Sequence, residues 1–133
     1  MKQEQKELLL KDISARLPYN VKCTYYDKCV NEEDKGTITG MQNGTYFVID
    51  GVCIDVENVK PYLFPLSSMT EEQRKEYDSI IYHNIELHVD RYYEVIDVDS
   101  FELLRDFYHK NHLDYGGLIL VGLAKDATNL NIY

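Results

Sequence analysis

Three side chains that could share a divalent cation alternate along one short stretch of the sequence, Glu86, His88 and Asp90. Apolar residues separate them, which is the period of a half-buried β-strand. On a strand, alternate side chains share one face at a spacing of roughly 7 Å, close enough for carboxylates and an imidazole to contact one ion. The outward face of any amphipathic strand is also polar, so a solvated surface explains the same pattern.

A second set of possible metal ligands lies near the end of a predicted helix. His109 and His112 are three residues apart, a spacing that places both imidazoles on one helix face, and Asp114 follows them. No second pair of ligands stands at a recognisable zinc spacing. Histidines near a helix C-terminus are also favoured by the helix dipole, which is the more ordinary explanation.

The three cysteines, Cys23, Cys29 and Cys53, form no C-x-x-C pair. An odd number of cysteines without a recognisable signal peptide indicates a reducing compartment, so we expect a cytoplasmic protein. The sequence contains no glycine-rich phosphate loop, no nucleophile elbow and no H-E-x-x-H motif. We therefore expect no cofactor, and an enzyme is the less favoured class.

Tyrosine is the most distinctive residue type, with twelve tyrosines and no tryptophan. Two adjacent pairs, Tyr25-Tyr26 and Tyr92-Tyr93, each place one ring on either side of a predicted strand, and Tyr46 begins another strand. Exposed tyrosines on a small sheet favour a peptide-binding groove, although half-buried tyrosines are also common in small domains. The acidic loop at 31–34 would attract a basic ligand to it.

The net charge of −9 is uneven, because residues 1–66 carry 8 basic and 10 acidic side chains whereas residues 67–133 carry 6 and 13. Such a balance disfavours direct binding to nucleic acid. It suits either solubility or an acidic decoy that would occupy the basic groove of a nucleic-acid-binding protein. The acids that such a decoy would present are Glu86, Asp90, Glu94, Asp97, Glu102 and Asp106.

The first half, residues 1–66, predicts a helix followed by a small barrel. Apolar residues recur at helical spacing over 3–17, and Pro18 ends the pattern. Asn43-Gly44 and Asp50-Gly51 separate three β-rich runs, which is a strong hairpin signal. With a strand over 21–26 in front and a 3₁₀ turn in 57–63 behind, we expect an SH3-like barrel of four to five short strands.

The second half, residues 67–133, reads as mostly helical. Thr70 and Gln73 fit a capping box for a helix from residue 71, and Asp99 fits the cap of another. Residues 85–98 alternate as one or two strands, and 115–123 reads as a last short helix. We expect both halves to share one core in a single α+β domain, residues 1–133, that does not cross a membrane.

Three stretches resemble segments of short uncharacterised proteins of gut Bacteroides-type bacteria and their mobile elements and prophages. They are KELLLKDISARLPYNVK, VKPYLFPLSSMTEEQRKEY and HLDYGGLILVGLAKDATNLNIY. They cover both ends and the connector, more than a third of the chain. The resemblance implies no activity, cofactor or catalytic residue.

The sequence favours a non-enzymatic interaction module whose partner is a protein or a peptide. The acidic decoy and a metal-dependent enzyme built on Glu86, His88 and Asp90 stay open as alternatives. The oligomeric state is left open too.

Overall fold

The computed structural model describes the backbone of residues 1–90 and 98–133, and the side chains of 1–81 and 101–133. Its helices are α1 (Gln3–Arg16), α2 (Glu71–Asp90) and α3 (Val98–Lys110), with short 3₁₀ turns η1 (Leu17–Tyr19), η2 (Val56–Asn58) and η3 (Leu66–Ser68). Its strands are β1 (Lys22–Asp27), β2 (Glu32–Gln42), β3 (Tyr46–Ile49), β4 (Val52–Asp55), β5 (Val59–Leu63) and β6 (Lys125–Asp126). The α+β class is therefore confirmed.

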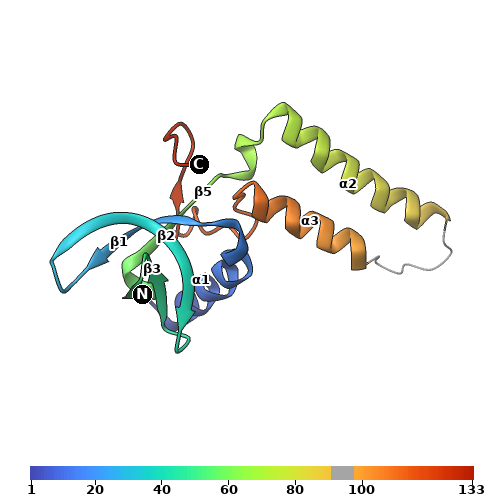
Figure 1. Cartoon of the computed structure of the whole chain (residues 1–133). Coiled ribbons are helices and arrows are strands. Elements are labelled where there is room, and N and C mark those ends of the chain that lie inside the picture. Colours follow the sequence, from blue (N-terminus) through green and yellow to red (C-terminus); the bar gives the residue numbers. More distant parts are fainter. Residues whose placement is uncertain (91–97) are drawn as a thin grey trace.

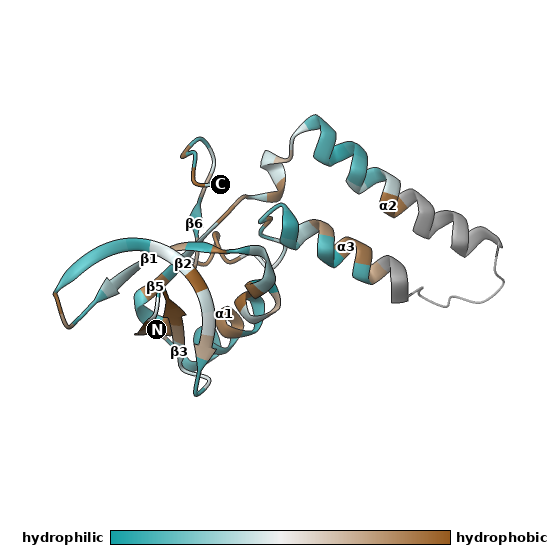
Figure 2. Cartoon of the chain, in the orientation of Figure 1, coloured by the Kyte–Doolittle hydropathy of each residue, from teal (hydrophilic) through white to brown (hydrophobic). Residues whose placement is uncertain are grey.

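The predicted helix over 3–17 is α1, which ends where Pro18 enters the 3₁₀ turn η1. Leu9 and Ile13 point from α1 into the core and are fully buried. Hydrophobic positions gather on β3 and on the neighbouring side of α1 (Figure 2). On β3, Phe47 and Ile49 are as fully buried as the two α1 residues. The helix thus covers one face of the curled sheet.

The two predicted hairpins are present and join β2, β3 and β4 into an antiparallel meander. Asn43 and Gly44 have positive φ angles in the first turn, and Asp50 and Gly51 have them in the second. Asparagine, aspartate and glycine tolerate this left-handed region better than other residues, which is why these dipeptides turn the chain here.

The strand order is β4-β3-β2-β1-β5-β6, with antiparallel pairing except between β5 and β6. Strand β2 arches across the molecule in Figure 1, and its register with β3 shifts between Ile38 and Gly40. Within the described part of the chain the edge strands β4 and β6 do not pair, so the sheet is open. The closed barrel predicted from the sequence is not found.

The expected 3₁₀ turn in 57–63 is only partly right. The turn η2 covers Val56–Asn58, and Asp55 caps it by accepting a hydrogen bond from the Glu57 N–H at 3.1 Å. The following residues form β5, whose Val59 and Leu63 are fully buried and which pairs with β1.

Helices α2 and α3 form a hairpin that projects from the sheet (Figure 1). The predicted capping box is present, since the Thr70 N–H donates to Gln73 Oε1 at 2.9 Å and the Gln73 N–H donates to Thr70 Oγ1 at 3.2 Å. The strand expected over 85–98 is wrong for 85–90, which continue α2. Residues 91–97 lie outside the described part. Helix α3 begins at Val98, one residue before the predicted cap Asp99.

The helix expected over 115–123 is also wrong, because this segment consists of turns. The Asp114 carboxylate accepts the Leu118 and Ile119 N–H groups at 2.8 and 2.9 Å, and Gly117 has a φ of +73°. The carboxylate thus satisfies two backbone N–H groups without a helix, and the positive φ of Gly117 lies outside the right-handed helical region. Leu118 and Leu123 pack in the same core cluster as α1 and the meander, so the two halves share buried residues.

No helix in the described ranges has the length and apolar character needed to cross a lipid bilayer.

Candidate functional site

The predicted tyrosines of β1 divide between core and surface. Tyr25 packs against the core cluster, whereas the side chain of its neighbour Tyr26 is 37% exposed. Tyr46, at the start of β3, is 39% exposed. Tyr92 and Tyr93 lie outside the described residues. The exposed candidates that can be placed are thus Tyr26 and Tyr46.

Tyr26 and Tyr46 line the same groove, which has a volume of about 250 Å³. The remaining walls come from the end of β1 with its following turn, from β4, and from η2, namely Asp27, Lys28, Cys29, Cys53, Ile54, Asp55 and Asn58. Strands β1 and β4 approach each other here without pairing. The groove is therefore the gap that remains where the curled sheet fails to close.

The free edge of β4 forms one wall of this groove. The two-residue turn at Asp50-Gly51 makes Ile49 and Val52 a hydrogen-bonded pair, and in an antiparallel ladder such pairs alternate along the strands. The hydrogen bond from the Val56 N–H to the Thr45 carbonyl, 3.1 Å long, is what this alternation of hydrogen-bonded pairs predicts for the next position along the two strands. The N–H and C=O groups of Cys53 and Asp55 therefore point away from β3. Among the residues that the structure describes they have no strand partner, and an unpaired edge of this kind is the template for strand addition.

Hydrogen bonds hold the walls of the groove in place. The Tyr26 hydroxyl donates to Asn31 Oδ1, and Asp27 Oδ1 accepts the Cys29 N–H at 2.9 Å across the β1–β2 turn. The Cys53 thiol donates to Gln42 Oε1 at 2.7 Å. A groove fixed in this way loses less conformational entropy when a ligand binds.

The charge of the groove is acidic, with Asp27 and Asp55 against Lys28 among its lining residues. The acidic loop expected at 31–34 is wrong as a loop, because β2 already begins at Glu32. The three acidic residues 32–34 nevertheless are exposed on that strand, beside β1. The acidic side chains expected here therefore lie on a strand in place of a loop, and one of them, Glu33, is paired with Lys125 at 3.4 Å.

The metal hypothesis on Glu86, His88 and Asp90 concerns side chains outside the described ones, so it stays a prediction. Its premise is wrong, however, because the backbone there is helical and residues two apart on a helix do not share a face. No group of three His, Cys, Asp or Glu side chains suited to a metal occurs among the described residues.

Both histidines of the second proposed metal set have partners within the protein. His109 lies 2.9 Å through Nε2 from the Tyr115 hydroxyl, and His112 stacks on Tyr133 with ring centroids 3.6 Å apart. Burial is the main cause that lowers the pKa of both imidazoles, to about 4 for His112. Both rings are therefore engaged in contacts within the fold as neutral imidazoles.

Of the six acids considered for a decoy surface, only Glu102 and Asp106 have described side chains, and both are exposed on α3. The decoy therefore stays a prediction.

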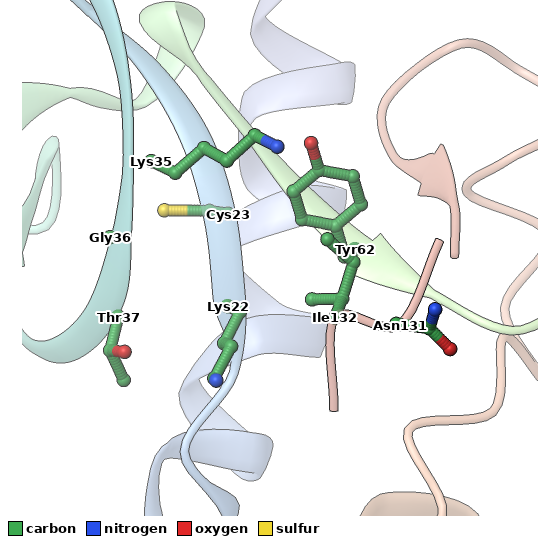
Figure 3. Close-up of a pocket in the computed structure, with 8 residues that line it drawn as sticks. All are labelled: Lys22, Cys23, Lys35, Gly36, Thr37, Tyr62, Asn131 and Ile132. Atoms are coloured by element: carbon green, nitrogen blue, oxygen red, sulfur yellow. The ribbon is translucent and has the colours of Figure 1, made fainter. Parts of the chain in front are cut away.

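Cys23, on β1, lines a hollow of about 300 Å³ together with Lys22, Lys35, Tyr62 and residues near the end of the chain (Figure 3). The residue is fully buried, and burial, followed by the charge of Asp50, raises the pKa of its thiol to about 12. Such a thiol stays protonated and is a poor nucleophile.

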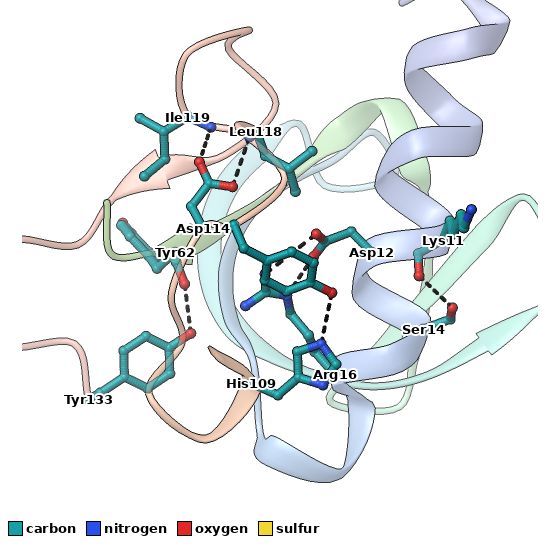
Figure 4. Close-up of polar contacts among 11 residues, drawn as sticks. Lys11, Asp12, Ser14, Arg16, Tyr62, His109, Asp114, Leu118, Ile119 and Tyr133 are labelled. Atoms are coloured by element: carbon teal, nitrogen blue, oxygen red, sulfur yellow. Dashed lines mark hydrogen bonds and ion pairs between the residues drawn. The ribbon is translucent and has the colours of Figure 1, made fainter. Parts of the chain in front are cut away.

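A buried ion pair that the sequence reasoning missed connects α1 to the C-terminal half. Arg16 is 0% exposed and donates from Nε to Asp12 Oδ1 at 2.5 Å (Figure 4). The Tyr115 ring lies 4.8 Å from its guanidinium carbon. The four-residue spacing of Asp12 and Arg16 could have indicated this pair, because it places both on the helix face of the buried Leu9 and Ile13.

Comparison of the chain with protein-family models, with curated proteins and with solved structures gave no significant match.

Proposed function

We propose that this protein is a non-enzymatic interaction module that binds an extended peptide segment of a partner protein in the groove beside β4. One observation carries the proposal: two exposed tyrosines and an unpaired strand edge line the same groove. Main-chain bonds to Cys53 and Asp55 would supply affinity, and Tyr26 and Tyr46 would contact alternate side chains of the added strand.

The architecture supports this role. A bent antiparallel sheet of five strands, β1 to β5, with a 3₁₀ turn before the last of them is an open variant of an SH3-like barrel in this proposal. Small sheets of that kind present grooves where strand ends and turns meet. The carboxylates of Asp27 and Asp55 favour a ligand with basic side chains, so binding should weaken as salt increases.

A random library of displayed dodecapeptides tests the proposal. Peptides selected on the wild-type protein should bind the Tyr26→Ala and Tyr46→Ala variants at least about tenfold more weakly, as expected for interface aromatics. Phe101→Ala is the matched control, because it removes an exposed aromatic ring from α3, away from the groove. It should leave affinity unchanged, and all three variants should melt close to the wild type.

Methylation of single backbone amides in a selected peptide tests strand addition itself. Methylation at every second residue should weaken binding, because those N–H groups would pair with β4. Equal affinity of the two tyrosine variants and the wild type would overturn the proposed groove. Insensitivity to every methylation would overturn strand addition.

A further inference from the structure

A second concavity, of about 440 Å³, lies between α1, α3 and the turn that follows α3. Helix α1 contributes Leu8, Lys11 and Ala15 to it, α3 contributes Arg105, and the turn contributes Tyr115. None of its lining residues belongs to the groove beside β4. Its volume falls within the range of small-molecule sites.

The cleft carries excess positive charge in an otherwise acidic chain. Lys11 and Arg105 are both exposed, and neither has a carboxylate within 4 Å among the described side chains. The carboxylate that lines the cleft, Asp12, is bound to the buried Arg16. Two cations from different helices therefore line the opening with no carboxylate paired to them among the described side chains, in a protein whose net charge is −9.

Tyr115 gives the cleft a rigid aromatic wall. Its ring stacks on Tyr108 at 4.9 Å between centroids and lies over the guanidinium of Arg16. Its hydroxyl lies 2.9 Å from His109 Nε2, and this contact fixes it. Burial raises the pKa of the Tyr115 phenol, so the wall adds no negative charge at neutral pH. The ring is still 39% exposed, so a flat ligand can pack against its exposed part at little entropic cost.

Apolar surface completes the cleft. Leu8 is 41% exposed although it lies in a concavity, and the small side chain of Ala15 leaves room about two helical turns further along α1. Gly116 keeps the turn close to α1, since a Cβ atom there would lie 3.1 Å from Asp12 Oδ2. The site thus combines an apolar floor, an aromatic wall and two cations at its rim.

We propose that this cleft binds a small organic anion. The flat apolar part of the ligand would lie against Tyr115 and Leu8, and its carboxylate, phosphate or sulfonate would lie between Lys11 and Arg105. The proposal is independent of the peptide groove, because the two sites share no residue.

Titration with 2-naphthyl phosphate, followed through the backbone amides by NMR, tests the proposal. The amides of Lys11 and Gly116 should shift together and saturate. Lys11→Gln and Arg105→Gln combined should weaken binding by roughly tenfold or more, since charge-assisted hydrogen bonds are lost. A matched double variant, Lys22→Gln with Lys35→Gln, removes two cations at the hollow of Figure 3 and should bind like the wild type.

Two further probes separate the parts of the ligand. 2-Naphthol lacks the charge and inorganic phosphate lacks the ring, so each should bind at least about tenfold more weakly than the naphthyl phosphate. The proposal is overturned if the amide shifts lie elsewhere, if both double variants lose affinity equally, or if 2-naphthol binds as tightly.

Discussion

Removing one partner of the Asp12–Arg16 ion pair should destabilise the protein more than removing both. Arg16 is fully buried, and its Nε and Nη2 atoms contact the two oxygens of Asp12 at 2.5 and 3.4 Å. Its Nη1 has no hydrogen-bond partner among the described residues. Asp12→Asn would thus leave a buried cation without its counterion, which costs about 3–5 kcal/mol of unfolding free energy.

For a chain of this length, 1 kcal/mol corresponds to a change in melting temperature of about 3–5 °C, so Asp12→Asn should melt roughly 10–25 °C below the wild type. Arg16→Met should be destabilising as well, because it leaves the Asp12 carboxylate largely buried and unpaired. The double variant contains no buried charge at this site and should recover most of the loss.

Urea denaturation of the wild type, both single variants and the double variant gives the coupling energy. We expect a coupling of about 2–3 kcal/mol. The reasoning would be refuted if Asp12→Asn lost less than about 1 kcal/mol, or if the losses of the single variants simply added in the double variant.

Two other perturbations follow from the structure. Burial, then the charges of Arg16 and Lys22, lower the pKa of His112 to about 4 from 6.5, so the unfolded chain binds a proton that the folded chain does not. The stabilisation from this group is therefore fully present above about pH 6.5, and the free energy of unfolding falls by roughly 3 kcal/mol as the pH drops to 4. In urea titrations at a series of pH values, His112→Asn should make the free energy of unfolding less dependent on pH over this range. An unchanged slope in the variant would contradict the role of His112. A methyl group on Gly36 would lie 2.5 Å from a side-chain carbon of β3, whereas one on Gly40 would lie 3.9 Å from its nearest neighbour. Gly36→Ala should thus cost about 1–3 kcal/mol in thermal denaturation and Gly40→Ala little, and equal melting temperatures would argue against the contact.

Local signals predicted the elements that the structure confirms. The hairpins at Asn43-Gly44 and Asp50-Gly51 and the capping box of Thr70 depend on residues within one turn of each other. Their chemistry fixes the backbone with little help from tertiary contacts, which explains why they could be read from the sequence.

The errors arose where tertiary contacts or continuity decide the conformation. The alternating apolar residues of 85–90 also fit the continuation of a helix that Thr70 has already started. The apolar composition of 115–123 favours a helix, but the Asp114 carboxylate accepts hydrogen bonds from two backbone N–H groups of this segment and holds it in turns.

Individual residues of the candidate sites could be predicted from the sequence, but not which of them lie together in space. Tyr26 and Tyr46 were identified from their type, yet their meeting in one groove depends on how the open sheet curls. The cleft between α1 and α3 was missed because Lys11 and Arg105 are far apart in the sequence and carry no motif.

Two of the three thiols lie on strands of the sheet and the third lies in the turn after β1, at two different depths, which gives the protein an internal reporter of opening events. Cys29 and Cys53 are exposed, whereas Cys23 is sealed on β1, between β2 and β5. An alkylating reagent will modify the outer pair first. It reaches the inner sulfur only when β1 separates from its neighbours and the thiol regains ordinary acidity, so the slow phase of labelling reads the frequency of that separation.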